Sequence, residues 1–338
     1  TTDYSTHSRT QLAYISRNLI ADGGMENGGI GGRLQGDAAS SYSTITSQVK
    51  KDAQSIQITN GDATPASFRN IFATASGEDY VIRAWHRGAA TVAVGNLLAV
   101  GATVIINTTQ AGVTANTWGF VESCYEAVGT STDLHIQSSS ATSAQTCQYD
   151  DLKILPTLVE NGGMEGGAGP PTGWTQEAGA TVTSDTDEHS GTNSLLITAT
   201  GGDQGANQSL SGAFVAGNWY ELSLWYKKGT ATGKVMINDG AANVVSATDL
   251  TETSYTRRSW IFKAGGTGAG IYIRAVSAGT VYFDDIAIVH RPDLSVSFNN
   301  MTNGYRFEPT RLARGYKSGA NEQLNFAATG NATQTAGR

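Results

Sequence analysis

The 338-residue chain has little charge, only two cysteines and no long apolar run. Charged residues make up 15% of it, against about a quarter in typical globular proteins, and 29 acidic residues outnumber 22 basic ones. The sequence is acidic overall and contains no basic cluster. Both features argue against a nucleic acid partner, because binding to phosphates requires concentrated Lys and Arg. No apolar run approaches the roughly 20 residues that cross a bilayer, so no membrane contact is expected.

Catalytic signatures are missing as well. The sequence has no Gly-x-Ser-x-Gly, His-Glu-x-x-His or phosphate-loop pattern, each of which would indicate a nucleophile, a metal or a nucleotide. Nothing indicates the cleft across which a glycosidase places its acid and its base. No histidine stands beside a recurring cysteine or serine motif; the five are His7, His86, His135, His189 and His290. We therefore expect no enzymatic activity.

Glycine, in contrast, is abundant, with 41 residues, and it separates short stretches that have the period of β-strands. Apolar and polar residues alternate at 134–137, 220–226 and 271–275, and Val, Ile, Thr and Tyr are favoured there. Gly, Asn, Asp and Ser interrupt the runs about every ten residues, as turns do. The pattern predicts an all-β chain built from antiparallel β-sandwiches.

Four motifs occur twice in the same order, about 134 to 140 residues apart. They are DGGME at 22–26 with NGGME at 161–165, SIQIT at 55–59 with SLLIT at 194–198, a Gly-to-Trp stretch at 77–85 and 217–225, and YDDL at 149–152 with FDDI at 283–286. So long a period indicates two tandem copies of one domain. We expect them at 18–156 and 157–291, with a polar N-terminal lead-in at 1–17 and an extended C-terminal tail at 292–338.

The second copy follows a familiar order of motifs: NGGME at 161–165, GWT at 173–175, HSGTNSL at 189–195, GNWYELSLW at 217–225 and YFDDI at 282–286. This order resembles the galactose-binding-like jelly-roll domain of carbohydrate-binding modules. The first copy departs from it, because no Gly-Trp follows Glu26 and no His-Ser-Gly precedes Ser55. The resemblance implies two tandem jelly-roll sandwiches and a carbohydrate ligand.

Strand alternation selects the candidate ligand residues. If Tyr220 and Leu222 face the core, Trp225 points outward, and the same register turns Trp85 outward in the first copy. A neighbouring strand is expected to add Tyr272 and Arg274, with His135 and Gln137 as its counterpart in the first copy. The alternative is that both tryptophans pack under a loop or against the sister domain. The predicted ligand-binding residues are Arg83, Trp85, Arg87, Trp225, Lys227, Tyr272 and Arg274.

Structural calcium is implied by the resemblance, since an ion often joins the first loop to the last strand in such domains. The matching carboxylates would be Glu26 with Asp150, and Glu165 with Asp284. Calcium prefers six to eight oxygen ligands, which carboxylates and nearby carbonyls supply. The alternative is turn chemistry, because Asp-Gly-Gly and Asn-Gly-Gly form turns without any ion.

Both cysteines fall in the first copy. Cys124 and Cys147 lie on segments expected to be late strands, where the second copy has apolar residues near Ile261 and Val281. This pattern fits a buried thiol pair that replaces aliphatic core residues, or a disulfide in an oxidising compartment. We favour reduced thiols.

The tail at 292–338 is rich in Gly, Asn, Thr and Ala and builds no core, so we expect it to order only against a partner. Tandem jelly rolls with such an extension are similar to bacteriophage virion proteins. We therefore predict a non-enzymatic, homo-oligomeric virion structural protein (a capsid decoration, fibre or baseplate component). The tail would dock it to other subunits at the virion surface, and the sandwiches would contact host glycans. The alternative is a secreted carbohydrate-binding accessory protein of a polysaccharide-degrading system.

Overall fold

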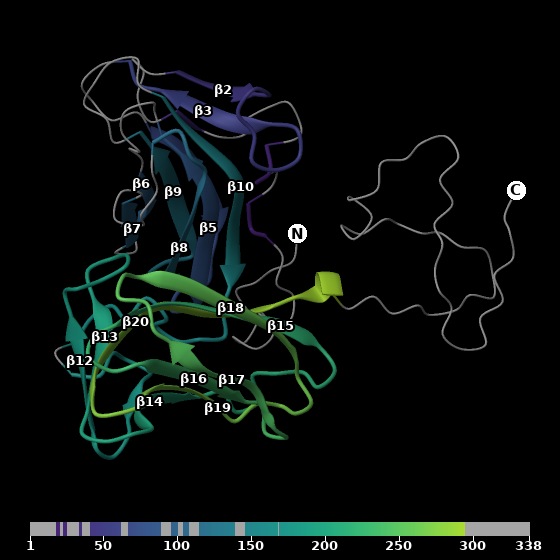
Figure 1. Cartoon of the computed structure of the whole chain (residues 1–338). Helices are drawn as coiled ribbons and strands as arrows, with labels where there is room; N and C mark the ends of the chain where they lie inside the picture. Colours follow the sequence, from purple (N-terminus) through teal and green to yellow (C-terminus); the bar gives the residue numbers. More distant parts are fainter. Residues whose placement is uncertain are drawn as a thin grey trace, which may run out of the picture. The chain divides into compact units, whose positions relative to one another are not determined.

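The structure is a computed structural model that describes residues 18–20, 23–25, 34–35, 41–61, 67–88, 96–100, 104–107, 115–138, 146–167 and 169–294. The chain divides into two units, Thr1–Pro292 and Asp293–Arg338. The lead-in and nearly all of the predicted tail lie outside the described residues. Within them, regular structure consists of twenty strands and the 3₁₀ turn Pro292–Leu294 (Figure 1), and no helix there is long and apolar enough to cross a membrane.

The first ten strands form two five-stranded antiparallel sheets, with the orders β1-β4-β9-β6-β7 and β2-β3-β10-β5-β8. The strands are β1 (Leu34–Gln35), β2 (Ser41–Ile45), β3 (Ser55–Thr59), β4 (Ser67–Ala73), β5 (Asp79–Arg87), β6 (Asn96–Val100), β7 (Val104–Asn107), β8 (Gly119–Glu126), β9 (Ser131–Gln137) and β10 (Thr146–Pro156).

The last ten strands repeat this topology, with the orders β11-β14-β19-β16-β17 and β12-β13-β20-β15-β18. The strands are β11 (Thr175–Gln176), β12 (Ala180–Asp185), β13 (Ser194–Ala199), β14 (Gln204–Ser209), β15 (Trp219–Lys228), β16 (Gly233–Asn238), β17 (Asn243–Leu250), β18 (Thr256–Lys263), β19 (Gly270–Ala275) and β20 (Gly279–His290). The all-β fold class and the tandem arrangement are thereby confirmed. The domain boundaries stay a prediction, because both pairs of sheets fall in one unit.

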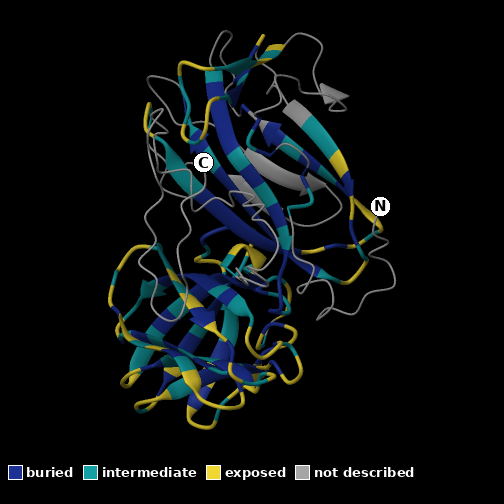
Figure 2. Cartoon of the chain, turned by 90° about the vertical axis from the view of Figure 1, so that its right-hand side faces the viewer, coloured by how far each residue is buried: buried dark blue, intermediate teal, exposed yellow. Residues whose placement is uncertain are grey.

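Long strands of each half bury one face in that half's own core, and Figure 2 shows buried and half-buried residues alternating along several of them. On β15, Tyr220, Leu222, Leu224 and Tyr226 all belong to the core of the second half. On β5, Ile82 and Ala84 lie in the core of the first half. Since side chains alternate across a strand, the remaining positions of β5 and β15 face away from these cores, as the sequence predicts.

The repeated Gly-Gly-Met turns occupy equivalent places against the last long strand of each half. The amide of Leu152 donates to the carbonyl of Gly23, and the amide of Ile286 donates to that of Gly162, both at 2.9 Å. The turns end at Met25 and Met164, which are both buried with φ near +60°. The two motifs that define the repeat therefore have matching surroundings.

The repeated Asp-Asp pair forms a β-bulge in each half. Asp151 and Asp285 have left-handed backbones, with φ values of 48° and 47°, and the strand register shifts beside each of them. The first aspartate of each pair accepts hydrogen bonds from a loop: Asp150 from the loop before β3, and Asp284 from the loop before β13. Asp150 accepts the amides of Lys50 and Lys51, while Asp284 accepts those of His189 and Ser190.

Candidate functional site

The second half presents a row of side chains across the outer face of the sheet β11-β14-β19-β16-β17. Strand register aligns one residue from each strand, and we call this set the Tyr272 row: Thr175, Asn207, Tyr272, Met236 and Ser246. The three central side chains are half-buried and the two at the ends are exposed. An aromatic ring therefore lies in the middle of a polar, solvent-facing strip.

Neighbouring groups fix the position of the Tyr272 ring. A Cβ at Gly270 would come within 3.3 Å of the ring, so glycine leaves room there for the tyrosine. On the other side, the guanidinium carbon of Arg274 lies 4.8 Å from the ring centroid. Arg274 is held in turn by both carboxylate oxygens of Glu177, at 2.7 and 2.6 Å. Hydrogen bonding to Glu177 raises the pKa of Arg274, so the charge beside the ring is permanent.

The predicted grouping of Tyr272 and Arg274 with Trp225 is wrong, because the two sets lie on different sheets. Tyr272 and Arg274 belong to β19, whereas Trp225 lies on β15 in the opposite sheet. In the first half, β9 with His135 and Gln137 is likewise opposite to β5. The strand that follows β18 in sequence crosses to the other sheet, as jelly-roll connections do.

Trp225 faces away from its core but is only 7% exposed. Its indole stacks on His189, with ring centroids 3.6 Å apart. His189 is itself held by Asp285 through a 2.7 Å contact between Nδ1 and Oδ2. Lys227, two residues further, pairs with Asp187 and lies 4.6 Å from the ring centroid of Tyr282. Trp225 therefore packs beneath the loop before β13, and little of its ring is accessible to a ligand.

Arg83 is buried between the two halves. Its Nη2 donates to the Ser223 hydroxyl at 2.9 Å, and its Nε donates to Glu122, which is fully buried on β8. Arg257 on β18 donates to both oxygens of the same Glu122, at 3.0 and 3.1 Å. Glu221 accepts from Arg257 and also from Arg291. We call this set, Arg83, Glu122, Glu221, Arg257 and Arg291, the junction network.

The junction network favours the ionised form of Glu122. Burial by itself would favour the neutral carboxyl, but Arg83 and Arg257 outweigh it and hold the pKa of Glu122 below its usual value. Beside the network lies a small apolar cluster from both halves: Val81, Cys124, Ala287 and Val289, with Leu155 packed against it. The outer faces of β5 and β15 thus meet each other, and Arg83, predicted to bind a ligand, instead contacts the second half.

Trp85 and Arg87 lie beyond the junction on the outer face of β5, and both are half-buried. The Trp85 ring meets the edge of Phe120 at a centroid distance of 5.3 Å. Arg87 donates to Gln148 at 3.1 Å and to the side chain of Asn116 at 2.8 Å. These two residues therefore keep part of their surface towards solvent.

The carboxylates predicted to hold calcium are engaged with backbone amides. Glu165 accepts the amides of Thr192 and Asn193, and Asp284 accepts those of His189, Ser190 and Asp285. Burial and the neighbouring Asp285 raise the pKa of Asp284 well above its usual value.

Calcium is bound by carboxylate and carbonyl oxygens, and in this structure the carboxylate oxygens of Glu165 and Asp284 accept hydrogen bonds from backbone amides. Within the described residues no three His, Cys, Asp or Glu side chains gather as metal ligands. Asp150 accepts the amides of Lys50 and Lys51, and its proposed partner Glu26 lies outside the described residues. Calcium binding stays a prediction.

Cys124 and Cys147 are both buried, and neither forms a disulfide bond. They do not form the expected buried pair, because they pack on different faces of one sheet. Cys147 belongs to the first-half core, whereas Cys124 lies in the apolar cluster at the junction. The Cys124 amide donates to Asp285 of the second half at 2.7 Å.

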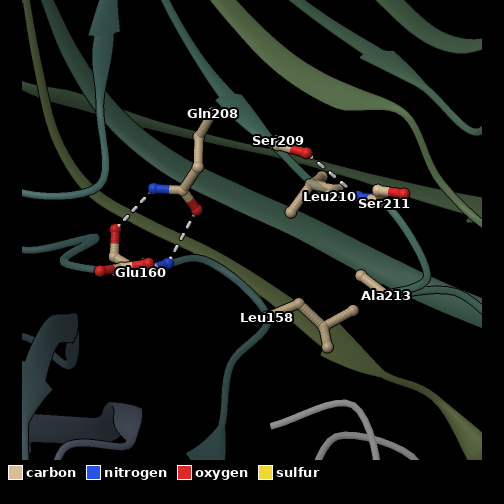
Figure 3. A pocket seen from close by; sticks show the side chains of 7 residues that line it. All are labelled: Leu158, Glu160, Gln208, Ser209, Leu210, Ser211 and Ala213. Atoms are coloured by element: carbon tan, nitrogen blue, oxygen red, sulfur yellow. Dashed lines mark hydrogen bonds between the residues drawn. The ribbon is translucent and has the colours of Figure 1, made fainter.

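A pocket of about 150 Å³ opens where the chain enters the second half. Figure 3 shows Glu160 and Gln208 at one side of it, joined by two hydrogen bonds of 2.8 Å between the Gln208 amide group and the Glu160 backbone. Leu158, Leu210 and Ala213 supply its apolar lining. It contains none of the residues that the sequence singles out.

No protein-family profile and no curated protein matches the chain. Among solved structures it matches the tandem CBM22-1–CBM22-2 domain of Paenibacillus barcinonensis Xyn10C, with 16% identity and a TM-score of 0.33, over 82% of this chain and 98% of that one. The chain is similar to carbohydrate-binding modules. A family 16 carbohydrate-binding module matches with 16% identity and a TM-score of 0.33, over 40% of this chain and 99% of that module.

A bacteriophage protein also matches. It is the enzymatically active domain of bacteriophage CBA120 tailspike protein 4, with 15% identity and a TM-score of 0.31; the match covers 40% of this chain and 21% of that one. These likenesses concern chain architecture, so the choice of a binding surface rests on the contacts of this chain alone.

Sequence reasoning missed Phe120, Glu122 and Arg257. One signal was present: Phe120, Glu122 and Cys124 alternate on the outer side of β8, where two of the three are apolar. Apolar residues on the solvent side of a strand suggest that the face is covered. Arg257 gave no signal, because single arginines are common on strand surfaces.

Proposed function

We propose that the chain binds a neutral polysaccharide through the Tyr272 row. The supporting observation concerns the two predicted aromatic residues of the second half. Tyr272 is half-buried in a mainly polar strip across a five-stranded sheet, while Trp225 is packed under a loop. Pyranose rings stack on aromatic faces through their C–H groups, and Asn207 with Thr175 and Ser246 can hydrogen-bond to the hydroxyls.

Replacing Tyr272 by alanine should weaken binding of a neutral oligosaccharide such as xylohexaose by about tenfold or more, because the stacking surface is lost. Isothermal titration calorimetry with the full chain measures this. Tyr272→Phe is the matched control, since it keeps the ring and removes only the hydroxyl, and it should bind nearly as well as the original chain. Equal binding by the alanine variant, or no binding of neutral glycans to the original chain, would reject the proposal.

The narrower role is that of a virion structural protein displayed on a particle, with the predicted docking tail at 292–338. It rests on tail composition and on the absence of catalytic motifs in the sequence. A secreted accessory protein of a polysaccharide-degrading system would use the same Tyr272 row, so glycan binding does not separate the two roles.

Deleting residues 293–338 separates them. Pro292 ends the first unit, so the deletion leaves that unit whole. In a virion protein it should abolish incorporation into particles while glycan affinity stays unchanged. Particle purification followed by immunoblotting reads incorporation, and calorimetry on the same truncated chain is the control. Normal incorporation of the truncated protein would count against the docking role.

A further inference from the structure

A second surface crosses from the first half to the second through four side chains in contact, which we call the junction strip: Lys50, Trp85, Phe120 and Arg257. The Lys50 ammonium lies 3.9 Å from the Trp85 ring centroid. Trp85 and Phe120 meet edge to face at 68°, and the guanidinium carbon of Arg257 lies 4.8 Å from the Phe120 centroid. Lys50 is exposed and the other three are half-buried.

The strip exists only because the two halves are joined. Lys50 lies in the loop before β3, Trp85 on β5 and Phe120 on β8 of the first half. Arg257 comes from β18 of the second half. Arg257 is fixed there by its bonds to Glu122, so its guanidinium is positioned before any ligand arrives. A preorganised cation loses less entropy when it binds an anion.

Positive charge gathers around the strip in a chain whose formal net charge is −7. The junction network contains three arginines and two glutamates, so its net charge is +1. Lys51 and Lys153 share the carboxylate of Asp151, both at 2.7 Å. Asp150, opposite Trp85 on β10, adds one negative charge and accepts the amides of Lys50 and Lys51, so cations still outnumber carboxylates here. Arg87, on the same face of β5, is held by the neutral side chains of Gln148 and Asn116. This face therefore suits an anion.

We propose that the junction strip binds an acidic oligosaccharide composed of uronic acid units. Its carboxylates would pair with Lys50 and Arg257, which cover the ring faces of Trp85 and Phe120, and its sugar rings would pack beside these two aromatic side chains. This surface is separate from the Tyr272 row and takes a different class of glycan, so it does not depend on that row.

Two other occupants fit the strip less well. Trp85 and Phe120 are nearly perpendicular, so they cannot stack successive bases as single-stranded nucleic acid platforms do. The chain's own ends lack the complementary charge. Residues 1–17 carry two arginines and one aspartate, and residues 295–338 carry five basic residues against two glutamates.

The experiment titrates the full chain with hexagalacturonate by calorimetry, with xylohexaose and an oligothymidylate as comparison ligands. Hexagalacturonate should bind, and its affinity should fall as salt rises, because ion pairs are screened. Trp85→Ala and Lys50→Glu should each weaken it about tenfold or more. Lys50 is exposed, so its substitution should leave folding intact, and urea denaturation checks this.

Tyr272→Ala is the matched control, because it should leave hexagalacturonate affinity unchanged while it lowers xylohexaose affinity. Failure of the Tyr272 row would therefore leave the junction strip unaffected, and the reverse also holds. The proposal is overturned if hexagalacturonate does not bind, if both strip variants bind it as well as the original chain, or if oligothymidylate binds more tightly.

Discussion

Replacing Glu122 by alanine is expected to destabilise the chain by about 3–5 kcal/mol, the usual cost of removing one partner from a buried ion pair. Glu122 is fully buried and accepts hydrogen bonds from Arg83 and Arg257. Without it, Arg83, which is 6% exposed, retains Glu221, itself partly buried, as its one countercharge among the residues that the structure describes. The free energy of unfolding from urea denaturation measures the loss.

Arg258→Ala on the same strand as Arg257 is the control. Arg258 pairs with Glu252 on the surface, and both side chains are more than a third exposed, so the loss should stay below about 1 kcal/mol. If Glu122→Ala and Arg258→Ala had equal free energies of unfolding, the junction network would make no contribution to stability.

The free energy of unfolding should also depend on pH through the carboxylate of Glu122. Its pKa is lower in the folded chain than in the unfolded chain, so its contribution is complete above the usual glutamate value of about 4.3 and disappears as pH falls through the folded pKa. Glu122→Gln lacks this group and should therefore lose less stability than the original chain between neutral and acidic pH.

Gly162→Ala is expected to cost about 3 kcal/mol or more, near the upper end of overpacking effects. A Cβ at Gly162 would lie 2.0 Å from the carbonyl oxygen of Ile286, which is strand backbone and cannot turn away. The Gly-Gly-Met turn would have to leave β20, and the hydrogen bond from the Ile286 amide would be lost. Thermal or urea unfolding measures the change.

Gly169→Ala provides the comparison. A Cβ at Gly169 would meet no atom within 4 Å, so this substitution should change stability by less than about 0.5 kcal/mol. The repeat adds an internal replicate, because a Cβ at Gly23 would lie 2.0 Å from the Leu152 carbonyl. If Gly162→Ala proved as mild as Gly169→Ala, the turn would not be tightly docked on β20.

The sequence predicts the fold well because its signals are local. Alternation along β15 assigns Tyr220 and Leu222 to the core and Trp225 to the opposite face, and the structure agrees. The repeated Gly-Gly-Met motif predicts equivalent turns, since a turn needs only a few neighbouring residues, and the matching φ values and hydrogen bonds of the two turns confirm this. The bulge at each Asp-Asp pair is not predicted from the sequence and is a finding of the structure.

The surroundings of the site could not be predicted in the same way. Alternation along β15 predicts that Trp225 points away from the core, but it does not predict that His189 stacks on the indole. Nor does it state that β19 lies in the opposite sheet, because sheet membership depends on crossover connections. Arg83 has a clear outward direction, yet its partners Glu122 and Ser223 lie 39 and 140 residues away along the chain.

The hydrogen bond from the Cys124 amide to Asp285 joins the two halves, so it would be lost if the halves were produced as separate proteins. β8 is the terminal strand of its sheet, and the second half occupies part of its free edge, including the close approach of Gly163 to the Cys124 carbonyl. Cutting the chain after Pro156 would uncover that edge together with the apolar side chains of Val81 and Leu155. An unpaired strand edge can form hydrogen bonds with a strand of another molecule. By covering the edge of β8, the second half therefore also protects the first half from self-association.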